Sequence, residues 1–194
     1  MYERLRSNIE EKVPLTEAEW QLCKSLFSPK KLRKKQYFLQ EGDVCRYTAF
    51  IEKGAMRSYS IDEKGNEHII QFGLEGWWIT DLYSFYTNEP STYTIDALED
   101  SEILQITQPN YEELMKQVPV MERYFRILLQ NRLIAMQRRL SGNLSLSAEQ
   151  KYRWLLQAHP DIFQRVPQHM IASYLGITKE TLSRIRGRVS NQKP

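Results

Sequence analysis

Residues 166–185 read VPQHMIASYLGITKETLSRI, and this stretch indicates two short helices joined by a tight turn. Pro167 suits a first helical position, because its missing N–H would have no partner there. Gly176 follows the last apolar residue of the first helix, as glycine does where a chain leaves a helix in the left-handed region. Thr178 is placed to cap the second helix with its hydroxyl. The stretch therefore predicts a helix-turn-helix.

The two faces of the second predicted helix differ in character. Leu182 and Ile185 are spaced to point inward, whereas the residues around them are polar or charged. A DNA-binding helix-turn-helix has this arrangement, because its second helix enters the major groove with its N-terminal residues on base edges. The alternative is an ordinary pair of helices with a polar outer face. The glycine turn, the capping threonine and the basic-polar second helix together favour DNA binding.

The composition is that of an ordinary globular protein. The chain has 194 residues, of which 41% are hydrophobic and 26% charged. Its apolar runs are shorter than the roughly 20 residues of a membrane helix, and residues 1–12 lack the apolar core of a signal peptide. We therefore expect a cytoplasmic protein that makes no membrane contact. Cys23 and Cys45 stand far apart without a partner motif, so we expect free thiols and no metal or cofactor.

Charge is distributed unevenly, although the net charge is only +3. Residues 1–109 contain 13 Lys and Arg against 18 Asp and Glu, whereas residues 147–194 contain eight against three. A basic C-terminal segment suits the phosphate backbone of nucleic acid, which supplies most sequence-independent affinity. A solvated positive surface would show the same charge, so this feature agrees with DNA binding without requiring it.

The region after residue 30 indicates a β-rich domain. The residues before it have a helical pattern, with a capping box at Thr16 and Glu19. Beyond it, short apolar runs alternate with turn signals, which include Glu41-Gly42-Asp43, Lys53-Gly54 and Leu74-Glu75-Gly76. This spacing predicts many short antiparallel strands in a sandwich or jelly roll. We interpret the basic run at residues 30–35 as a solvated strand edge rather than a nucleic-acid patch.

A long helix is predicted after the β-rich region. A short helix at residues 111–118 comes first, and a second pattern runs from Pro119 to Leu140, where Ser141-Gly142-Asn143 is expected to form a hinge. Its apolar residues recur every three or four positions, so the helix needs a partner. Packing against its own strands is one interpretation, and a homodimer seam is the one we favour. The predicted seam residues are Met121, Phe125, Leu128, Leu129 and Met136.

One more helix is predicted between the long helix and the helix-turn-helix. Ser147 and Gln150 form a capping box at its start. Its apolar face is predicted to carry Trp154, Leu155 and Ala158.

These parts in this order resemble the Crp/Fnr family of bacterial transcription regulators. The resemblance rests on Glu41-Gly42-Asp43, on residues 50–78 (FIEKGAMRSYSIDEKGNEHIIQFGLEGWW) and on residues 175–186 (LGITKETLSRIR). It implies an α+β fold with an N-terminal antiparallel β-roll like a cyclic-nucleotide-binding domain, a long dimerisation helix and a C-terminal winged-helix-like helix-turn-helix domain. These would span residues 1–117, 118–142 and 143–194.

The same resemblance implies roles for residues on DNA. Lys179, Glu180 and Arg184 match base-contacting positions, Thr178 and Thr181 match phosphate contacts, and Ser183 lies among them. The chemistry agrees, because arginine can pair bidentately with guanine and glutamate can accept from the cytosine amino group.

The resemblance is weakest at the ligand pocket. Nucleotide-binding members carry a Gly-Glu-Leu turn and a later Arg-Ser pair that holds the cyclic phosphate, whereas this chain has Thr80-Asp81-Leu82 and Ser91-Thr92. Asp81 could still accept from a sugar hydroxyl. Losing the bidentate arginine contact costs on the order of a few kcal/mol, so we do not expect cyclic AMP to bind. Two interpretations are open for the aromatic residues nearby: they fill the pocket, which we favour, or they shape an apolar one. These residues are Trp77, Trp78, Tyr83, Phe85, Tyr86 and Tyr93.

Two functions from different classes remain open. The first is a homodimeric, sequence-specific DNA-binding regulator that reads a near-palindromic site, with RNA polymerase as a further expected partner. The second is a small-molecule sensor whose N-terminal pocket binds an unidentified effector, with DNA contact secondary. We discount an enzyme, because a jelly-roll oxygenase needs two or three histidines and a carboxylate on a metal, whereas the β-rich region holds only His68.

Overall fold

A computed structural model describes residues 1–190, except the side chain of Ser190. The chain divides into two compact units. The first unit contains Met1–Ser60 and Gln71–Gln130, and the second contains Ile61–Ile70 and the residues from Asn131 onward. The division falls inside the predicted long helix, and a short hairpin segment goes with the second unit.

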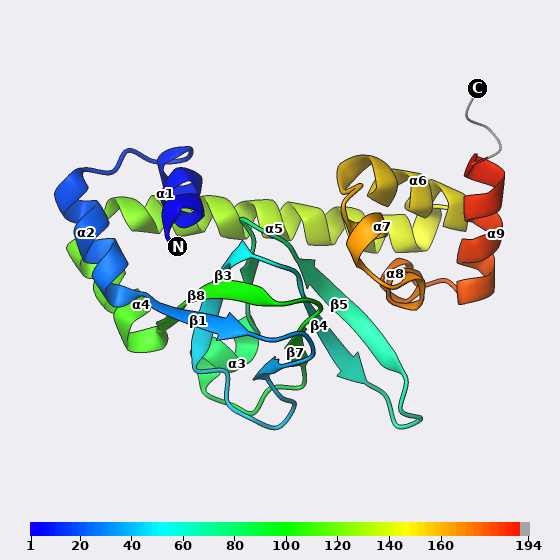
Figure 1. Ribbon diagram of the computed structural model, residues 1–194, viewed down its shortest axis with the longest axis horizontal. Coiled ribbons are helices and arrows are strands. Elements are labelled where there is room, and N and C mark those ends of the chain that lie inside the picture. Colours follow the sequence, from blue (N-terminus) through cyan, green and yellow to red (C-terminus); the bar gives the residue numbers. More distant parts are fainter. Residues whose placement is uncertain (191–194) are drawn as a thin grey trace. The chain divides into compact units, whose positions relative to one another are not determined.

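Two four-stranded sheets make up the β-rich part of the chain (Figure 1), and all their strand residues belong to the first unit except Ile61 of β4 and residues 67–70 of β5. Their strand orders are β1-β8-β3-β6 and β2-β7-β4-β5, and the ladders of β8 with β1 and β3 and of β7 with β2 and β4 are antiparallel. The jelly-roll expectation from the turn spacing is therefore confirmed. The strands are β1 (Ser28–Leu32), β2 (Tyr37–Leu39), β3 (Tyr47–Lys53), β4 (Met56–Ile61), β5 (Glu67–Gly73), β6 (Trp78–Ile79), β7 (Thr94–Ala97) and β8 (Ser101–Thr107).

The basic run at residues 30–35 lies at the edge of its sheet, as predicted. Strand β1 pairs with β8 on one side and ends its sheet on the other. Lys31, Arg33 and Lys34 are exposed, while Leu32 is buried in the core. Charged side chains on an edge strand discourage pairing with another chain, which gives this run a structural explanation.

Helices cover the sheets of the first unit. They are α1 (Glu3–Glu10), α2 (Glu17–Leu26), α3 (Leu82–Thr87), α4 (Gln108–Gln117) and the first part of α5 (Val120–Ser145). The predicted capping box is present, since the Thr16 hydroxyl accepts from the Glu19 N–H and the Glu19 carboxylate accepts from the Thr16 N–H. The buried carboxylate of Glu52 accepts from the N–H groups of Arg4 and Leu5 at 3.3 and 2.7 Å, which ties α1 to β3.

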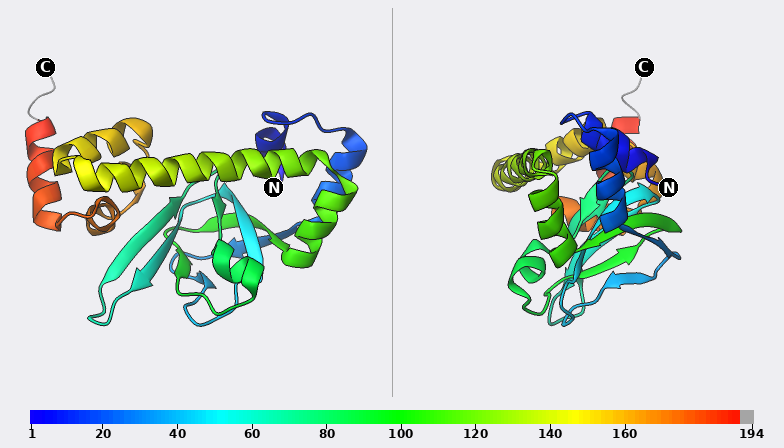
Figure 2. Two further views of the ribbon diagram at one scale, coloured as in Figure 1. Left: turned by 180° about the vertical axis from the view of Figure 1, so that it is seen from behind. Right: turned by 90° about the vertical axis from the view of Figure 1, so that its left-hand side faces the viewer.

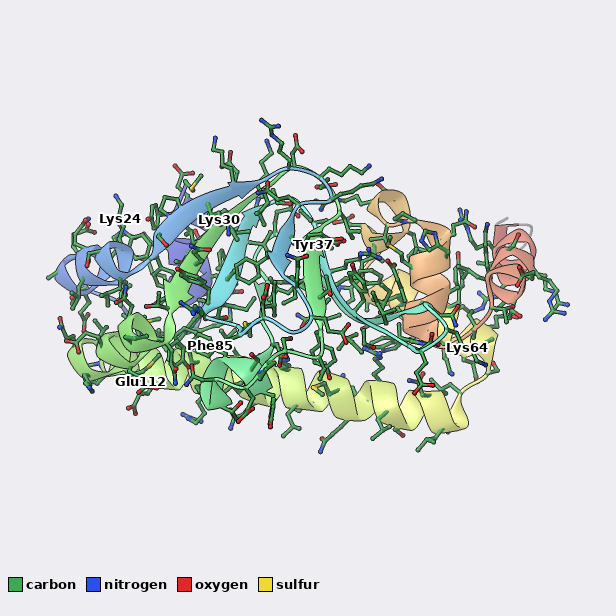
Figure 3. The ribbon with its side chains drawn as sticks, turned by 90° about the horizontal axis from the view of Figure 1, so that it is seen from below. Lys24, Lys30, Tyr37, Lys64, Phe85 and Glu112 are labelled. Atoms are coloured by element: carbon green, nitrogen blue, oxygen red, sulfur yellow. The ribbon has the colours of Figure 1, made fainter. Side chains whose placement is uncertain are left out.

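An aromatic cluster joins α5 to the β-roll of the first unit. The Trp78 ring lies 5.5 Å from Phe50 and 5.2 Å from Phe125, and Phe125 lies 4.7 Å from Tyr111 of α4. Phe85 of α3, which is labelled in Figure 3, extends this cluster, because its ring lies 5.9 Å from that of Tyr111. The first turns of α5 therefore belong to the core of the chain's own first unit.

The second unit is helical apart from its hairpin segment. Helices α6 (Ala148–Ala158), α7 (Ile162–Arg165), α8 (Gln168–Leu175) and α9 (Lys179–Ser190) follow the end of α5, and α9 packs on α6 and α8 (Figure 2). Residues 131–190 contain helices and no strand, so this described part of the chain has a helix-turn-helix without the strands of a wing. Among the described residues, no helix is long and apolar enough to cross a membrane.

The predicted hinge at Ser141-Gly142-Asn143 is wrong, because α5 continues through these residues to Ser145. The Ser145 hydroxyl donates to the Ser141 carbonyl at 2.8 Å, and the Leu146 N–H donates to the Gly142 carbonyl at 2.9 Å. Glycine inside a helix costs about 1 kcal/mol relative to alanine. That cost weakens the helix here without ending it.

The capping box at the start of α6 is confirmed, but its predicted apolar face is partly wrong. The Ser147 hydroxyl accepts from the Gln150 N–H, and the Gln150 side chain accepts from the Ser147 N–H. Tyr152 and Leu155 are buried, whereas Trp154 is 40% exposed. The Tyr152 ring packs 5.1 Å from Phe163, a contact from α7 that the sequence pattern of α6 alone does not contain.

Candidate nucleic-acid interface and ligand pocket

The turn between α8 and α9 has the geometry that its glycine predicts. Gly176 has φ 65° and ψ 39°, in the left-handed region. Its N–H donates to the Ser173 carbonyl, and the Ile177 N–H donates to the Ala172 carbonyl at 3.0 Å. A side chain would be strained at this φ, so glycine fixes the angle at which the chain leaves α8 and enters α9.

Helix α9 begins at a threonine cap. The Thr178 hydroxyl accepts from the Thr181 N–H at 3.2 Å and lies 3.1 Å from the Thr181 hydroxyl. The inner face of the helix is closed, because Leu182 and Ile185 are buried. The cap and the buried face together orient the first two turns of α9.

Four of the predicted DNA-contacting residues share the outer face of α9. Lys179, Glu180, Ser183 and Arg184 are exposed and lie at the spacing of one helical face. Thr181 is half-buried beside the exposed Thr178. The pKa of the Glu180 carboxyl lies below its usual range, because the carboxylate accepts from its own backbone N–H and from the Thr178 hydroxyl. Glu180 is therefore an ionised acceptor at neutral pH.

Sequence reasoning missed one cation of this face. Arg188 is exposed and follows Arg184 by one helical turn. In the described part of the chain, the Arg184 side chain makes no hydrogen bond or ion pair. The i, i+4 spacing from Glu180 through Arg184 to Arg188 is present in the sequence, and it identifies Arg188 as a residue of the same helical face.

Two of the five residues predicted to line an effector pocket, Asp81 and Ser91, bond to each other. Asp81 is 4% exposed, and its carboxylate accepts from the N–H groups of Tyr83 and Ser84 at the start of α3. Its second oxygen accepts from the buried Ser91 hydroxyl at 2.7 Å. Both oxygens of the Asp81 carboxylate therefore already accept hydrogen bonds within the protein.

The other predicted pocket residues are divided between core and surface. The buried Thr80 hydroxyl lies 3.4 Å from the Cys45 sulfur and 3.4 Å from the Tyr47 carbonyl. Leu82 is half-buried and Thr92 is exposed. The Arg57 guanidinium, buried in the β-roll, donates twice to Asp96 at 2.8 and 3.0 Å, so that carboxylate neutralises it.

The aromatic residues expected to fill the pocket differ in how much of their surface is exposed. Phe85 is buried, whereas Tyr83 and Tyr86 are exposed. Trp77, Trp78 and Tyr93 are half-buried. Of these six aromatic residues, Phe85 alone is buried.

Both cysteines are free and buried. Burial raises the pKa of the Cys23 thiol to about 11 and also raises that of Cys45. Among the described residues, no group of three His, Cys, Asp or Glu side chains is placed to hold a metal ion.

Comparisons with known proteins agree with this geometry. Residues 29–118 match the cyclic nucleotide-binding domain family. The chain is 30% identical over 192 residues to the regulatory protein HlyX of Actinobacillus pleuropneumoniae, and the match covers 91% of this chain and 78% of HlyX. This chain belongs to the Crp/Fnr family of transcription regulators. It is a transcription regulator and not an enzyme.

Other members of the Crp/Fnr family share the sequence or the fold. The fumarate and nitrate reduction regulatory protein of Vibrio cholerae is 27% identical, over 90% of this chain and 74% of that protein. FixK2 from Bradyrhizobium japonicum has a TM-score of 0.68 at 18% identity, covering 86% of this chain and 85% of that one. A CooA mutant from Carboxydothermus hydrogenoformans has a TM-score of 0.70 at 19% identity, covering 91% and 81%. These two structures share the fold with this Crp/Fnr regulator.

Proposed function

We propose that this Crp/Fnr regulator is a cytoplasmic homodimer that binds a near-palindromic DNA site without cyclic AMP, and that RNA polymerase is among its partners. The observation that carries the proposal is the N-terminal face of α9. Glu180, Ser183 and Arg184 are exposed there, while Leu182 and Ile185 are buried beneath them. A helix held in this way presents an acceptor and a bidentate donor to base edges.

An apolar stripe on α5 supports the dimer. Leu129, Leu133, Met136 and Leu140 follow one another by four, three and four residues, the spacing of a coiled-coil seam. Their exposed fractions are 44, 57, 61 and 64%. Four such side chains in a row indicate a surface that another helix covers.

The proposed seam includes only two of the five residues predicted from the sequence. Leu129 and Met136 lie on the stripe, while Met121 and Phe125 are buried in the core of the first unit and Leu128 packs against that core. Two copies of α5 side by side would place two α9 helices on one DNA duplex, and a two-fold arrangement reads a near-palindrome.

Independence from cyclic AMP is supported by the closed contacts at the former pocket. Asp81 is engaged by Ser91 and by the start of α3. A nucleotide would have to displace these hydrogen bonds, and buried polar groups left without partners are costly. The same contacts weigh against the alternative of a sensor whose effector binds in the N-terminal pocket.

The test is selection of DNA from a random duplex library by the purified protein, with and without cyclic AMP. We expect an enriched inverted repeat, and we expect cyclic AMP to change neither the enriched sequence nor the yield. Arg184→Ala should relax the preference at one base pair of each half-site, with a loss of roughly 1–3 kcal/mol for the favoured base.

Arg33→Ala is the matched control for this selection. It removes one exposed arginine from the first unit and leaves α9 intact. An unchanged sequence preference in Arg184→Ala would show that the register assigned to α9 is wrong. Enrichment that requires cyclic AMP would refute the proposed independence from the nucleotide.

A further inference from the structure

A cavity of about 530 Å³ lies within the second unit, and none of the residues that line it belongs to α9. Its walls come from the last turns of α5, from α6 and from the end of α8. This volume falls within the range of small-molecule pockets, which is about 300–1,000 Å³. The cavity has no role in the DNA-binding geometry described above.

The lining of this cavity is cationic and partly apolar. Arg138, Arg139 and Lys151 contribute three positive charges, and none of the described residues that line it is acidic. Trp154 and Leu175 contribute apolar surface. A site with several cations and no carboxylate favours an anion, and its aromatic wall favours a ligand with a flat or apolar body.

One of the three cations is held in place by its neighbours. The Arg139 guanidinium donates to the carbonyl groups of Ile69 and Ile70 in the hairpin segment and stacks 4.3 Å from the centre of the Tyr174 ring. A guanidinium fixed in this way needs little reorganisation when a ligand arrives. Arg139 and Tyr174 together form a preordered wall of the cavity.

The other two cations are available to a ligand. Arg138 is exposed and, within the described chain, makes no hydrogen bond or ion pair. The Lys151 amine makes one long hydrogen bond, 3.5 Å, to the Asn143 carbonyl. Either side chain can turn toward an anion without breaking a buried interaction.

The exposed tryptophan also points to a ligand. Trp154 is 40% exposed on a helix whose neighbouring residues Tyr152 and Leu155 are buried. A large aromatic side chain left at the wall of a cavity gains free energy when an apolar body covers it. The cavity therefore offers both halves of an amphipathic site, the cations and the apolar wall.

We propose that this cavity binds an amphipathic organic anion, a carboxylate or sulfonate joined to an aromatic or aliphatic body. The anionic group lies between Arg138 and Lys151, and the apolar body lies against Trp154. Binding at this site requires neither the former nucleotide pocket nor DNA, so its test is separate from that of the proposed function.

The probe for this site is anilinonaphthalene sulfonate, which carries one negative charge on an aromatic body. We expect one molecule to bind per chain and to accept excitation energy from tryptophan. Arg138→Gln and Lys151→Gln should each raise the Kd of the probe by roughly tenfold, because the loss of a hydrogen bond to a charged group weakens binding by about that factor. Trp154→Phe should reduce the energy transfer.

The controls separate a specific site from nonspecific dye binding. Arg33→Gln removes an exposed arginine of the first unit and should leave the Kd unchanged. N-Phenylnaphthylamine has the same aromatic body without the sulfonate and should bind more weakly by a similar factor. Circular dichroism confirms that each variant is folded. A wild-type Kd in both Arg138→Gln and Lys151→Gln, or equal affinity for the uncharged probe, would overturn the proposal.

Discussion

At the scale of single residues, the Asp81 carboxylate bonds to groups of the protein itself, at a position where the sequence predicted a possible ligand contact. It caps α3 through two N–H groups and accepts from the Ser91 hydroxyl, all while buried. The sequence alone does not show whether the Asp81 carboxylate accepts hydrogen bonds from a ligand or from groups of the protein itself. The sequence could place the residue, whereas its partners depend on how the loop around Ser91 folds back.

Replacing this carboxylate should destabilise the protein. Asp81→Ala removes the cap of α3, and loss of a capping side chain costs about 0.5–2 kcal/mol. We expect the free energy of unfolding in urea to fall by about 1–2 kcal/mol. Asp81→Asn should recover most of this loss, because the amide oxygen can still accept from the N–H groups of α3. Equal loss in the two variants would show that charge, and not capping, is what matters at this position.

The two thiols give a prediction about pH. Burial raises the pKa of Cys23 to about 11 and raises that of Cys45, whereas an unfolded thiol ionises near about 8.5. As the pH rises above the unfolded value, the unfolded state loses protons first, so stability falls. The slope should approach about 1.4 kcal/mol per pH unit for each thiol until the pH reaches the folded pKa.

Urea titrations between pH 7 and pH 10 measure this slope, with Cys23→Ala as the control. The same burial predicts that an aromatic disulfide reagent reacts slowly with the native protein at neutral pH and rapidly after unfolding, because the thiolate is the nucleophile. Rapid reaction of the native protein would contradict the burial of both cysteines.

At the scale of elements, the apolar stripe on helix α5 predicts the surface through which two copies of the chain form a dimer. Leu133→Asp places a charge in the middle of the apolar stripe, where a partner helix would have to desolvate it. We expect light scattering to show a dimer for the wild-type protein and a monomer, or a dimer weakened by at least about tenfold, for the variant.

The control lies on the same helix. Asn131 is exposed but is not on the stripe of Leu129, Leu133, Met136 and Leu140. Asn131→Asp should therefore leave the dimer intact. A dimer that tolerates Leu133→Asp would show that the copies meet through another surface.

Element boundaries show where sequence reasoning was reliable. The capping residues Thr16, Ser147 and Thr178 each start a helix as predicted, because capping is a local interaction between residues three apart. The hinge at Gly142 was wrong, because the surrounding helical residues outweigh one glycine. The exposure of Trp154 was missed, because α7 packs on Tyr152, and that contact is distant from the pattern of α6 itself.

At the scale of the whole molecule, the order of parts was predictable and the state of the pocket was not. Turn spacing, a long amphipathic helix and a capped helix-turn-helix each leave a periodic signal in the sequence. A cavity leaves no such signal. Arg138 and Lys151 lie 13 residues apart, and only the packing of α5, α6 and α8 brings both to one cavity.

The bond between Asp81 and Ser91 also bears on how this protein could evolve. Ser91→Arg would introduce a residue type that can hold a phosphate, yet it removes the hydroxyl that Asp81 accepts from. The new guanidinium would pair with Asp81 itself, since opposite charges that are buried together seek each other. Ser91→Arg alone should therefore not create a phosphate site, because its guanidinium would be held by Asp81.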